Sequence, residues 1–176
     1  MALPAWHEEA IAKHHRRAEF DCGEPELDTY LARYARQAHE RGAAKTFLAI
    51  ADDEPPGAVL GFYSVSPASL AFHDTPDSVR QGLARHEVPV FRLARLAVNR
   101  PVQGQGLGGQ LLLAAGRRCL RAASQTGGVA LLIDAKSDRA AQWYEAYGAV
   151  ARPDRPHSLL LPFATLCSAL SAAGRL

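Results

Sequence analysis

The sequence predicts an α/β (α+β) fold. Three observations lead to this prediction: a strand, a glycine-rich turn and a helix follow one another over residues 90–120, two apolar strands suggest a hairpin over 46–66, and a second strand–helix pair covers 129–147. Of the 176 residues, 48% are hydrophobic and 22% are charged, which is the composition of an ordinary globular protein. We therefore expect one domain over residues 1–176 with a hydrophobic core of its own.

The N-terminal part is predicted to be helical. Residues 5–18 are interpreted as a helix or partial helix whose basic residues and histidines form a solvated face. A second helix is expected to begin near Pro25, which suits a first helical turn, and to end at Gly42. Its buried face is expected to contain Leu27, Leu31, Tyr34 and Ala38.

The middle of the chain is predicted to form a hairpin and an irregular connection. Residues 46–51 and 58–66 are two apolar strands, and the loop between them is acidic and rich in proline. Residues 67–89 contain three prolines that interrupt regular structure. Two interpretations of this segment remain open, namely a strand followed by a mobile loop over the active site, or an ordinary connection.

The C-terminal part is predicted to continue with strands and helices. After a strand at 129–134, Ser137 or Asp138 is expected to cap a helix over 139–147. A basic turn, a strand at 158–161 and a terminal helix at 164–172 complete the predicted fold.

The turn before the central helix is the strongest candidate for a ligand site. Residues 103–109 read Gln-Gly-Gln-Gly-Leu-Gly-Gly, so side chains are nearly absent there. The first amide N–H groups of the following helix have no partner within the helix, and they lie at the positive end of its dipole. Such a turn is an anion site, and we expect it to bind the pyrophosphate of a nucleotide-like cofactor.

Three cofactor motifs can be compared with this turn. A P-loop requires Gly-Lys-Ser/Thr, but Gln110 follows Gly109, so that motif is excluded. The dinucleotide fingerprint Gly-x-Gly-x-x-Gly is matched by letter and stays as a less favoured alternative, because only 42 residues follow Asp134 to build a second half-sheet. The third pattern, Gln/Arg-x-x-Gly-x-Gly/Ala, is matched by Gln103, Gly106 and Gly108.

The third pattern is the signature of the GCN5-related N-acetyltransferase (GNAT) family, which the chain resembles. More narrowly, it resembles the acetyltransferase toxins of type II toxin–antitoxin systems. The resemblance implies a central mixed, mostly antiparallel sheet with a splayed parallel central strand pair, flanked by helices. The matching motifs occur in family order: Phe20-Asp21-Cys22-Gly23 with Leu27-Asp28-x-x-Leu31, then 61–66, Arg95-Leu96-Ala97-Val98, 103–109, and Trp143-Tyr144-x-x-x-Gly148.

The resemblance implies direct transfer of acetyl from acetyl-CoA to an amine. It identifies Tyr144 as the catalytic acid, a role that suits a phenol because its pKa near 10 keeps it protonated at neutral pH. Ala149 stands where the family pattern has Phe, which concerns local packing more than the acid. The residues expected to bind the cofactor are Leu96, Ala97, Val98, Gln103, Gly104, Gln105, Gly106, Leu107, Gly108, Gly109 and Ser137.

The toxin resemblance further implies that the acceptor is the α-amino group of an aminoacyl-tRNA, whose acetylation blocks translation. The formal net charge is only +2, so a tRNA would have to bind to a local basic patch. Residues that could flank such an acceptor site are Arg33, Arg36, Arg80, Arg85, Arg92 and Arg95. Arg92 and Arg95 are three apart and are expected on opposite faces of a regular strand. The alternatives are acetylation of a protein or a small amine, or an inactive module that binds acyl-CoA or an antitoxin.

Partners and setting are also expected from the sequence. The toxin resemblance implies a ribbon-helix-helix antitoxin, and a homodimer is possible. Three cysteines lie far apart and the seven histidines lack zinc-ligand spacing, so we expect no metal and a reduced, cytoplasmic setting. The N-terminus lacks a signal-peptide core, and no apolar stretch is long enough to span a bilayer.

Overall fold

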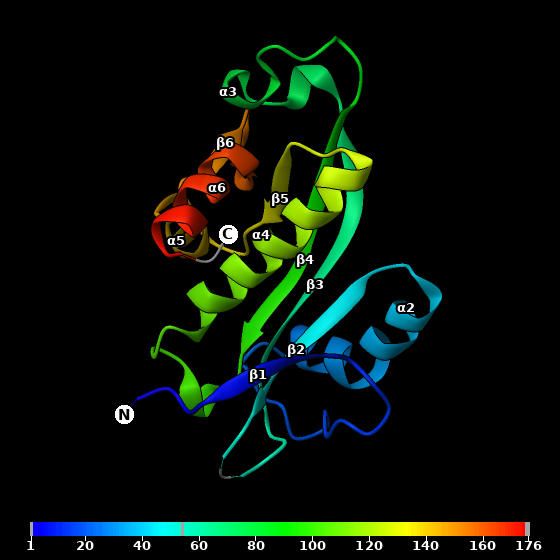
Figure 1. Ribbon diagram of the computed structural model, residues 1–176, viewed down its shortest axis with the longest axis vertical. Coiled ribbons are helices and arrows are strands. Elements are labelled where there is room, and N and C mark those ends of the chain that lie inside the picture. Colours follow the sequence, from blue (N-terminus) through cyan, green and yellow to red (C-terminus); the bar gives the residue numbers. More distant parts are fainter. Residues whose placement is uncertain (1, 54, 175–176) are drawn as a thin grey trace. The chain divides into compact units, whose positions relative to one another are not determined.

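The computed structural model describes residues 2–53 and 55–174. The chain forms two compact units, residues 1–66 with 95–115 (unit 1) and residues 67–94 with 116–176 (unit 2). The described residues contain a seven-stranded sheet in the order β1-β2-β3-β4-β5-β7-β6 (Figure 1). Strands β4 and β5 pair in parallel, whereas the pairs β1–β2, β2–β3, β5–β7 and β6–β7 are antiparallel. This mixed sheet with one parallel central pair confirms the predicted fold class.

Unit 1 contains the predicted hairpin. Strands β2 (Lys45–Ala51) and β3 (Val59–Leu70) pair antiparallel, with Phe47 opposite Tyr63. The prediction of a helix over residues 5–18 is wrong, because Trp6–Ala10 forms the strand β1 and pairs with β2. Its side chains also bond outside the strand: the indole Nε1–H of Trp6 donates to Gln110 Oε1 (3.0 Å). Pairing with β2, a partner distant in sequence, therefore overrides the local helical pattern.

The helical segment that follows is interrupted by a π-helix. Its three parts are α1 (Pro25–Thr29), the π-helix η1 (Tyr30–Tyr34) and α2 (Ala35–Arg41), which ends at Gly42 with φ 76°. Leu31 and Ala35 are fully buried, but Tyr34 is 56% exposed, so the prediction of Tyr34 as a buried residue is wrong. A π-helix bonds residue i to i+5, and its wider turn places Ala35 rather than Tyr34 beside Leu31 on the buried face.

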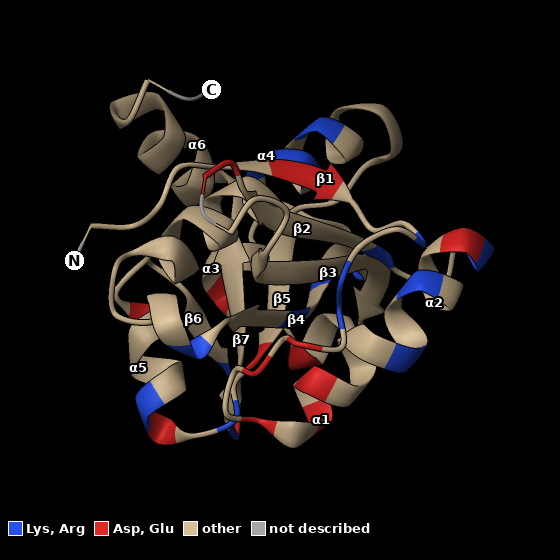
Figure 2. Cartoon of the chain, turned by 90° about the horizontal axis from the view of Figure 1, so that it is seen from below, with Lys and Arg blue, Asp and Glu red and all other residues tan. Residues whose placement is uncertain are grey.

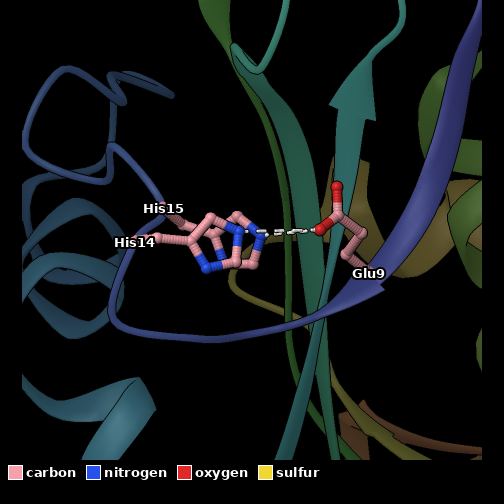
Figure 3. Close-up of side chains that lie close together, drawn as sticks. All are labelled: Glu9, His14 and His15. Atoms are coloured by element: carbon pink, nitrogen blue, oxygen red, sulfur yellow. Dashed lines mark hydrogen bonds and ion pairs between the residues drawn. The ribbon is translucent and has the colours of Figure 1, made fainter.

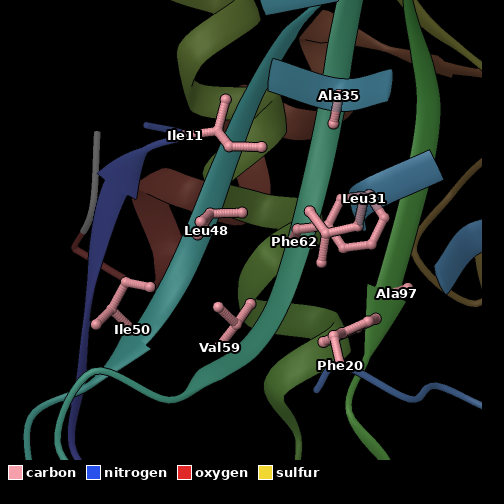
Figure 4. Close-up of a cluster of buried hydrophobic side chains, with 9 residues drawn as sticks. All are labelled: Ile11, Phe20, Leu31, Ala35, Leu48, Ile50, Val59, Phe62 and Ala97. Carbon is pink, nitrogen blue, oxygen red and sulfur yellow. The ribbon is translucent and has the colours of Figure 1, made fainter. Parts of the chain in front are cut away.

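The core of unit 1 joins this helical segment to one face of the strands (Figure 4). Phe62 is at its centre and meets the edge of the Phe20 ring at a centroid distance of 5.5 Å. The other residues of the cluster come from β2, β3, β4, α2 and the segments before it: Ile11, Leu31, Ala35, Leu48, Ile50, Val59 and Ala97. Burial of these side chains is the main force that fixes α1 and η1 against the sheet.

Strand, turn and helix follow one another where the sequence predicts them. Strand β4 (Val88–Val98) leads through the short 3₁₀ helix η3 (Arg100–Val102) to α4 (Leu107–Thr126). Within unit 1, a Cβ on Gly61 would lie 2.9 Å from the carbonyl oxygen of Ala97 and 2.9 Å from Leu111 Cδ1. Glycine at position 61 therefore permits the close approach of β3 to the end of β4 and to α4.

Unit 2 contains the remaining elements. A separate cluster of buried residues, which includes Val88, Val90, Leu132 and Leu160, forms its core. Residues 67–89 begin as a strand, as the first of the two interpretations expected, because β3 continues to Leu70. Short helices follow before β4 begins at Val88, and a mobile loop over the active site stays a prediction. Besides parts of β3, β4 and α4, this unit contains η2 (Phe72–Asp74), α3 (Asp77–Arg80), β5 (Ala130–Asp134), α5 (Asp138–Glu145), β6 (Val150–Arg152), β7 (Arg155–Pro162) and α6 (Phe163–Ala172).

Two details of unit 2 differ from the predictions. The basic segment 152–157, expected as a turn, belongs to the β6–β7 hairpin, in which Arg152 pairs with Arg155 and Asp154 adopts a left-handed φ of 57°. The strand predicted at 158–161 is correspondingly longer. Among the described residues, no helix combines the length and the apolar character that crossing a membrane requires.

Candidate active site

The glycine-rich turn of unit 1 presents free amide groups. Among the described residues, the backbone N–H groups of 104–109 donate to no protein acceptor, whereas Gln110 N–H begins the helical pattern by bonding to Gly106 O (3.3 Å). Gly104 and Gly106 have φ values of 78° and 92°, a backbone conformation that residues other than glycine rarely adopt. A Cβ at either position would meet no atom within 4 Å, so backbone conformation rather than space requires glycine here. The turn therefore has the donors and the open face that a pyrophosphate needs.

Gln103 fixes this turn through its side chain. Its amide Nε2 donates to the carbonyl oxygen of Val98 at 2.8 Å and to that of Cys22 at 2.9 Å. These two bonds use both hydrogens of the amide and join the turn to the end of β4 and to the segment before α1. The structure thus gives Gln103 a positioning role that the motif alone did not reveal.

The last residues of β4 lie directly before the turn. Ala97 is buried in the core of unit 1, while Leu96 and Val98 are half-buried. The predicted parallel pairing with β5 is present at residues 91–93, opposite 131–133. Among the described pairs, none joins Leu96–Val98 to β5, and the splay of the two strands stays a prediction.

Tyr144 lies near the end of α5 in unit 2. Its ring meets the edge of Trp143 at a centroid distance of 4.9 Å. Burial raises the pKa of Tyr144 from 10 to about 12, because the phenolate would lose its hydration. The hydroxyl therefore carries its proton throughout the physiological pH range, as a general acid must.

Ser137 begins α5, as predicted. Its Oγ accepts a hydrogen bond from Ala140 N–H at 3.2 Å, so the hydroxyl is the N-cap of the helix. Next to it, the carboxylate of Asp138 lies 2.6 Å from His157 Nε2. The hydroxyl of Ser137 is thus already used by the helix, and any contact with a cofactor would have to share it.

The six arginines predicted near an acceptor have different surroundings. Arg36 pairs with Glu40 (2.6 Å), and Arg92 pairs with Asp134 (2.5 Å). Arg80 bonds to the carbonyl of Phe72 at 3.2 Å, pairs with Asp77 and lies over the Phe72 ring, so it holds its own loop.

The other three arginines have no ion pair among the described residues. Arg33 and Arg85 are exposed, and the guanidinium of Arg95 stacks on Tyr30 in unit 1, a different surrounding from that of Arg92. Figure 2 shows basic residues on α2 and acidic residues on α1, so charge of both signs lies along this helical segment.

One cluster of potential metal ligands lies near the N-terminus, formed by Glu9, His14 and His15 (Figure 3). His15 is buried, and its Nδ1 accepts the backbone N–H of Ala12 at 2.9 Å. The neutral ring therefore carries its proton on Nε2, which donates to Glu9 Oε1 at 3.2 Å. A metal-bound histidine needs the opposite arrangement, with the second nitrogen as a donor, so this cluster is built for hydrogen bonding.

Comparison with known proteins places the chain among acetyltransferases. Residues 43–148 match the acetyltransferase (GNAT) domain. The chain is 39% identical over 142 residues to the tRNA-acetylating toxin of Mycobacterium tuberculosis (strain ATCC 25618 / H37Rv), an alignment that covers 81% of this chain and 82% of the relative.

Solved structures share the fold. AtaT complexed with acetyl-methionyl-tRNAfMet superimposes with a TM-score of 0.86 at 22% identity, over 94% of this chain and 99% of that chain. A tyrosine-to-phenylalanine variant of AtaT, bound to the C-terminus of the antitoxin AtaR and acetyl-CoA, gives a TM-score of 0.79 at 21% identity, over 94% of this chain and 98% of that chain. The likeness confirms the fold that the motifs predicted.

Proposed function

Because this chain belongs to the acetyltransferase (GNAT) domain family, we propose that it transfers acetyl from acetyl-CoA to the α-amino group of an aminoacyl-tRNA. The observation that carries the proposal is its 39% identity to a tRNA-acetylating toxin over four fifths of both chains. We assign the activity to the whole chain, residues 1–176, as one catalytic domain.

The cofactor assignment rests on the free amides of the turn. We assign the pyrophosphate of acetyl-CoA to the free N–H groups of residues 104–109, and the pantetheine amides to the backbone of Leu96, Ala97 and Val98. The N–H of Gln103, which was also expected to bind the pyrophosphate, instead donates to Arg100 O at 3.2 Å. The structure fits such a ligand, since the turn is rigidly held by Gln103 and offers donors without acceptors. Ser137 remains a proposed contact through its hydroxyl, which would then serve both helix and cofactor.

The chemistry needs one proton donor. Bound acetyl-CoA supplies the acetyl thioester. The neutral amine of the acceptor attacks the thioester carbonyl carbon, the C–S bond breaks, and the sulfur leaves with the electron pair. We assign to the hydroxyl of Tyr144 the proton that the sulfur receives, and the resulting tyrosinate regains a proton from the ammonium group formed by the attack. Burial of the hydroxyl keeps this proton in place until the reaction.

The biological setting follows from the same proposal. Acetylation of the α-amino group removes the nucleophile that forms the peptide bond, so translation stops. Such a toxin needs a neutralising partner, and we propose an antitoxin with a ribbon-helix-helix domain, a cytoplasmic location and a possible homodimer. The solved complex of AtaT with the C-terminus of the antitoxin AtaR supports an antitoxin as the protein partner.

A transfer assay tests the proposal. The protein is incubated with acetyl-labelled acetyl-CoA and a pool of charged tRNA, beside the same pool after mild deacylation. Label on the charged pool alone is the expected result, and Tyr144→Phe serves as the variant with a slow chemical step. Label on neither pool, with transfer to a peptide or polyamine, would indicate an ordinary acetyltransferase and refute the tRNA assignment.

A further inference from the structure

A groove in unit 1 is lined by residues that have no role in the acetyl transfer described above. Its volume is about 400 Å³, and it lies between the helical segment α1–η1 and strand β4. The residues that line it are Pro25, Glu26, Thr29, Tyr30, Tyr34 and Arg95. Two of the six are aromatic, one is a cation and one is an anion, so the groove combines flat surfaces with a balanced charge.

Arg95 provides a flat, positively charged surface in the groove. Its Cζ lies 3.7 Å from the centroid of Tyr30, a short cation–π distance. Tyr30 also packs against the core cluster that contains Phe62, with the two ring centroids 6.5 Å apart and an interplanar angle of 25°. Within the described residues, Arg95 makes no hydrogen bond or ion pair, so its N–H donors remain available to a ligand. A guanidinium supported in this way offers its second face for stacking.

Tyr34 provides an exposed aromatic ring in the same groove. It is 56% exposed, which is unusual for a tyrosine flanked by the buried residues of a helix. Its position results from the π-helix, which turns it out of the core. The guanidinium of Arg17 stabilises this π-helix by donating from Nη1 to the carbonyls of Leu31 (3.0 Å) and Ala32 (3.1 Å). The fold thus maintains a local irregularity whose effect is to expose one ring, and single-turn π-helices inside α-helices are frequently found at functional sites.

We infer that this groove binds a nucleobase from the unpaired 3′ end of the acceptor tRNA, with the base stacked against Tyr34 and the guanidinium of Arg95. The inference rests on the proposed function and specifies how that acceptor is held. Single-stranded RNA is recognised by stacking of splayed bases on aromatic rings and on arginine planes, which are the two surfaces present here.

The charges of the groove favour a base over a phosphate. Glu26 and Arg95 carry opposite charges, so a phosphate inside the groove would gain from one and be repelled by the other. A neutral base suits this balance, because the carboxylate of Glu26 and the hydroxyl of Thr29 can accept hydrogen bonds from an amino group on its edge. Phosphates of the tRNA are better met outside the groove, by exposed residues such as Arg33.

Kinetics with substituted proteins tests the inference. In Tyr34→Ala, KM for charged tRNA should rise about 5- to 150-fold, the range measured when one stacking ring is removed, with the main effect in KM rather than in kcat. Tyr34→Phe keeps the ring and should stay near the wild-type KM. Gln37→Ala, at an exposed residue of α2 outside the groove, is the matched control. Arg95→Lys keeps the charge but loses the plane, and it should raise KM as well.

A second measurement excludes an indirect effect. A short RNA with the sequence of a tRNA 3′ end, carrying no amino acid, should inhibit the reaction. Its inhibition constant should rise in Tyr34→Ala by a factor similar to that of KM. An unchanged KM in Tyr34→Ala, equal losses in the Ala and Phe variants, or an equal loss in Gln37→Ala would each overturn the inference. If the wild-type protein labels no charged tRNA at all, the proposed function itself fails, which is a separate result.

Discussion

Gln103 is predicted to act on cofactor affinity without touching the cofactor through its side chain. Replacement by alanine removes two hydrogen bonds, to Val98 O at 2.8 Å and to Cys22 O at 2.9 Å. Each such bond contributes about 0.5–1.5 kcal/mol, so the turn loses about 1–3 kcal/mol of its local order. In the variant, this ordering has to occur when acetyl-CoA binds, and the cost then appears in the affinity.

The expected result is a rise in the Kd of acetyl-CoA by roughly 5- to 150-fold, since about 1.4 kcal/mol corresponds to a factor of ten. Isothermal titration calorimetry measures the affinity, and thermal unfolding shows whether the fold persists. Gln105→Ala is the matched control, because Gln105 has the same side chain two positions along the turn but makes only one long bond, to Pro101 O at 3.4 Å. Equal affinities of the wild type and Gln103→Ala, or equal losses in both variants, would refute the positioning role.

Further predictions concern Tyr144, the glycines and Arg17. Tyr144→Phe should lower kcat about 10²- to 10⁴-fold with little change in the Kd of acetyl-CoA, which pre-steady-state kinetics can separate. Burial raises the pKa of Tyr144 to about 12, so its contribution to folding stability is complete below pH 10 and is lost only as the pH rises through 12. Chemical denaturation between pH 7 and 9 should therefore show a constant difference in the free energy of unfolding between wild type and Tyr144→Phe. Gly106→Ala forces a φ of 92° on a residue with a side chain and should cost about 1–2 kcal/mol, seen as weaker cofactor binding or lower stability, whereas an unstrained turn would show neither. Arg17→Met should destabilise unit 1 by removing the donor to two π-helix carbonyls, and an unchanged unfolding midpoint would contradict that role.

Much of the fold could be predicted because its signals are local. The Gly-rich turn, the helix cap at Ser137 and the end of α2 at Gly42 each depend on the residue itself and its near neighbours. The hairpin of β2 and β3 is likewise predicted by two apolar runs on either side of a polar loop. These features agree with the sequence because few distant contacts can alter them.

The parts that were missed depend on contacts far away in the sequence. Strand β1 carries a helix-like charge pattern, yet His7 pairs with Asp52 at 2.5 Å and the whole segment joins β2. The exposure of Tyr34 depends on the π-helix, which in turn is stabilised by Arg17, and no spacing rule predicts such a bulge. Likewise, the sequence shows Gln103 as a motif letter, whereas its two acceptor carbonyls are known only once the chain is folded.

The main-chain donors of the 103–109 turn have a genetic consequence. A point mutation can delete a side chain, but it cannot delete an amide N–H unless the new residue is proline. Under the proposed function, cells that must survive an unneutralised copy of this gene should therefore acquire few escape mutations at Gln105, where many substitutions leave the donors intact. Leu107 is fully buried, so its substitutions would act through the fold instead. Such cells should acquire escape mutations at Gly104 and Gly106, whose left-handed backbone tolerates few other residues, and at Gln103 and Tyr144. Positions that contribute only a backbone N–H should thus be rare among the escape mutations, and positions that need a particular side chain or a glycine should be common.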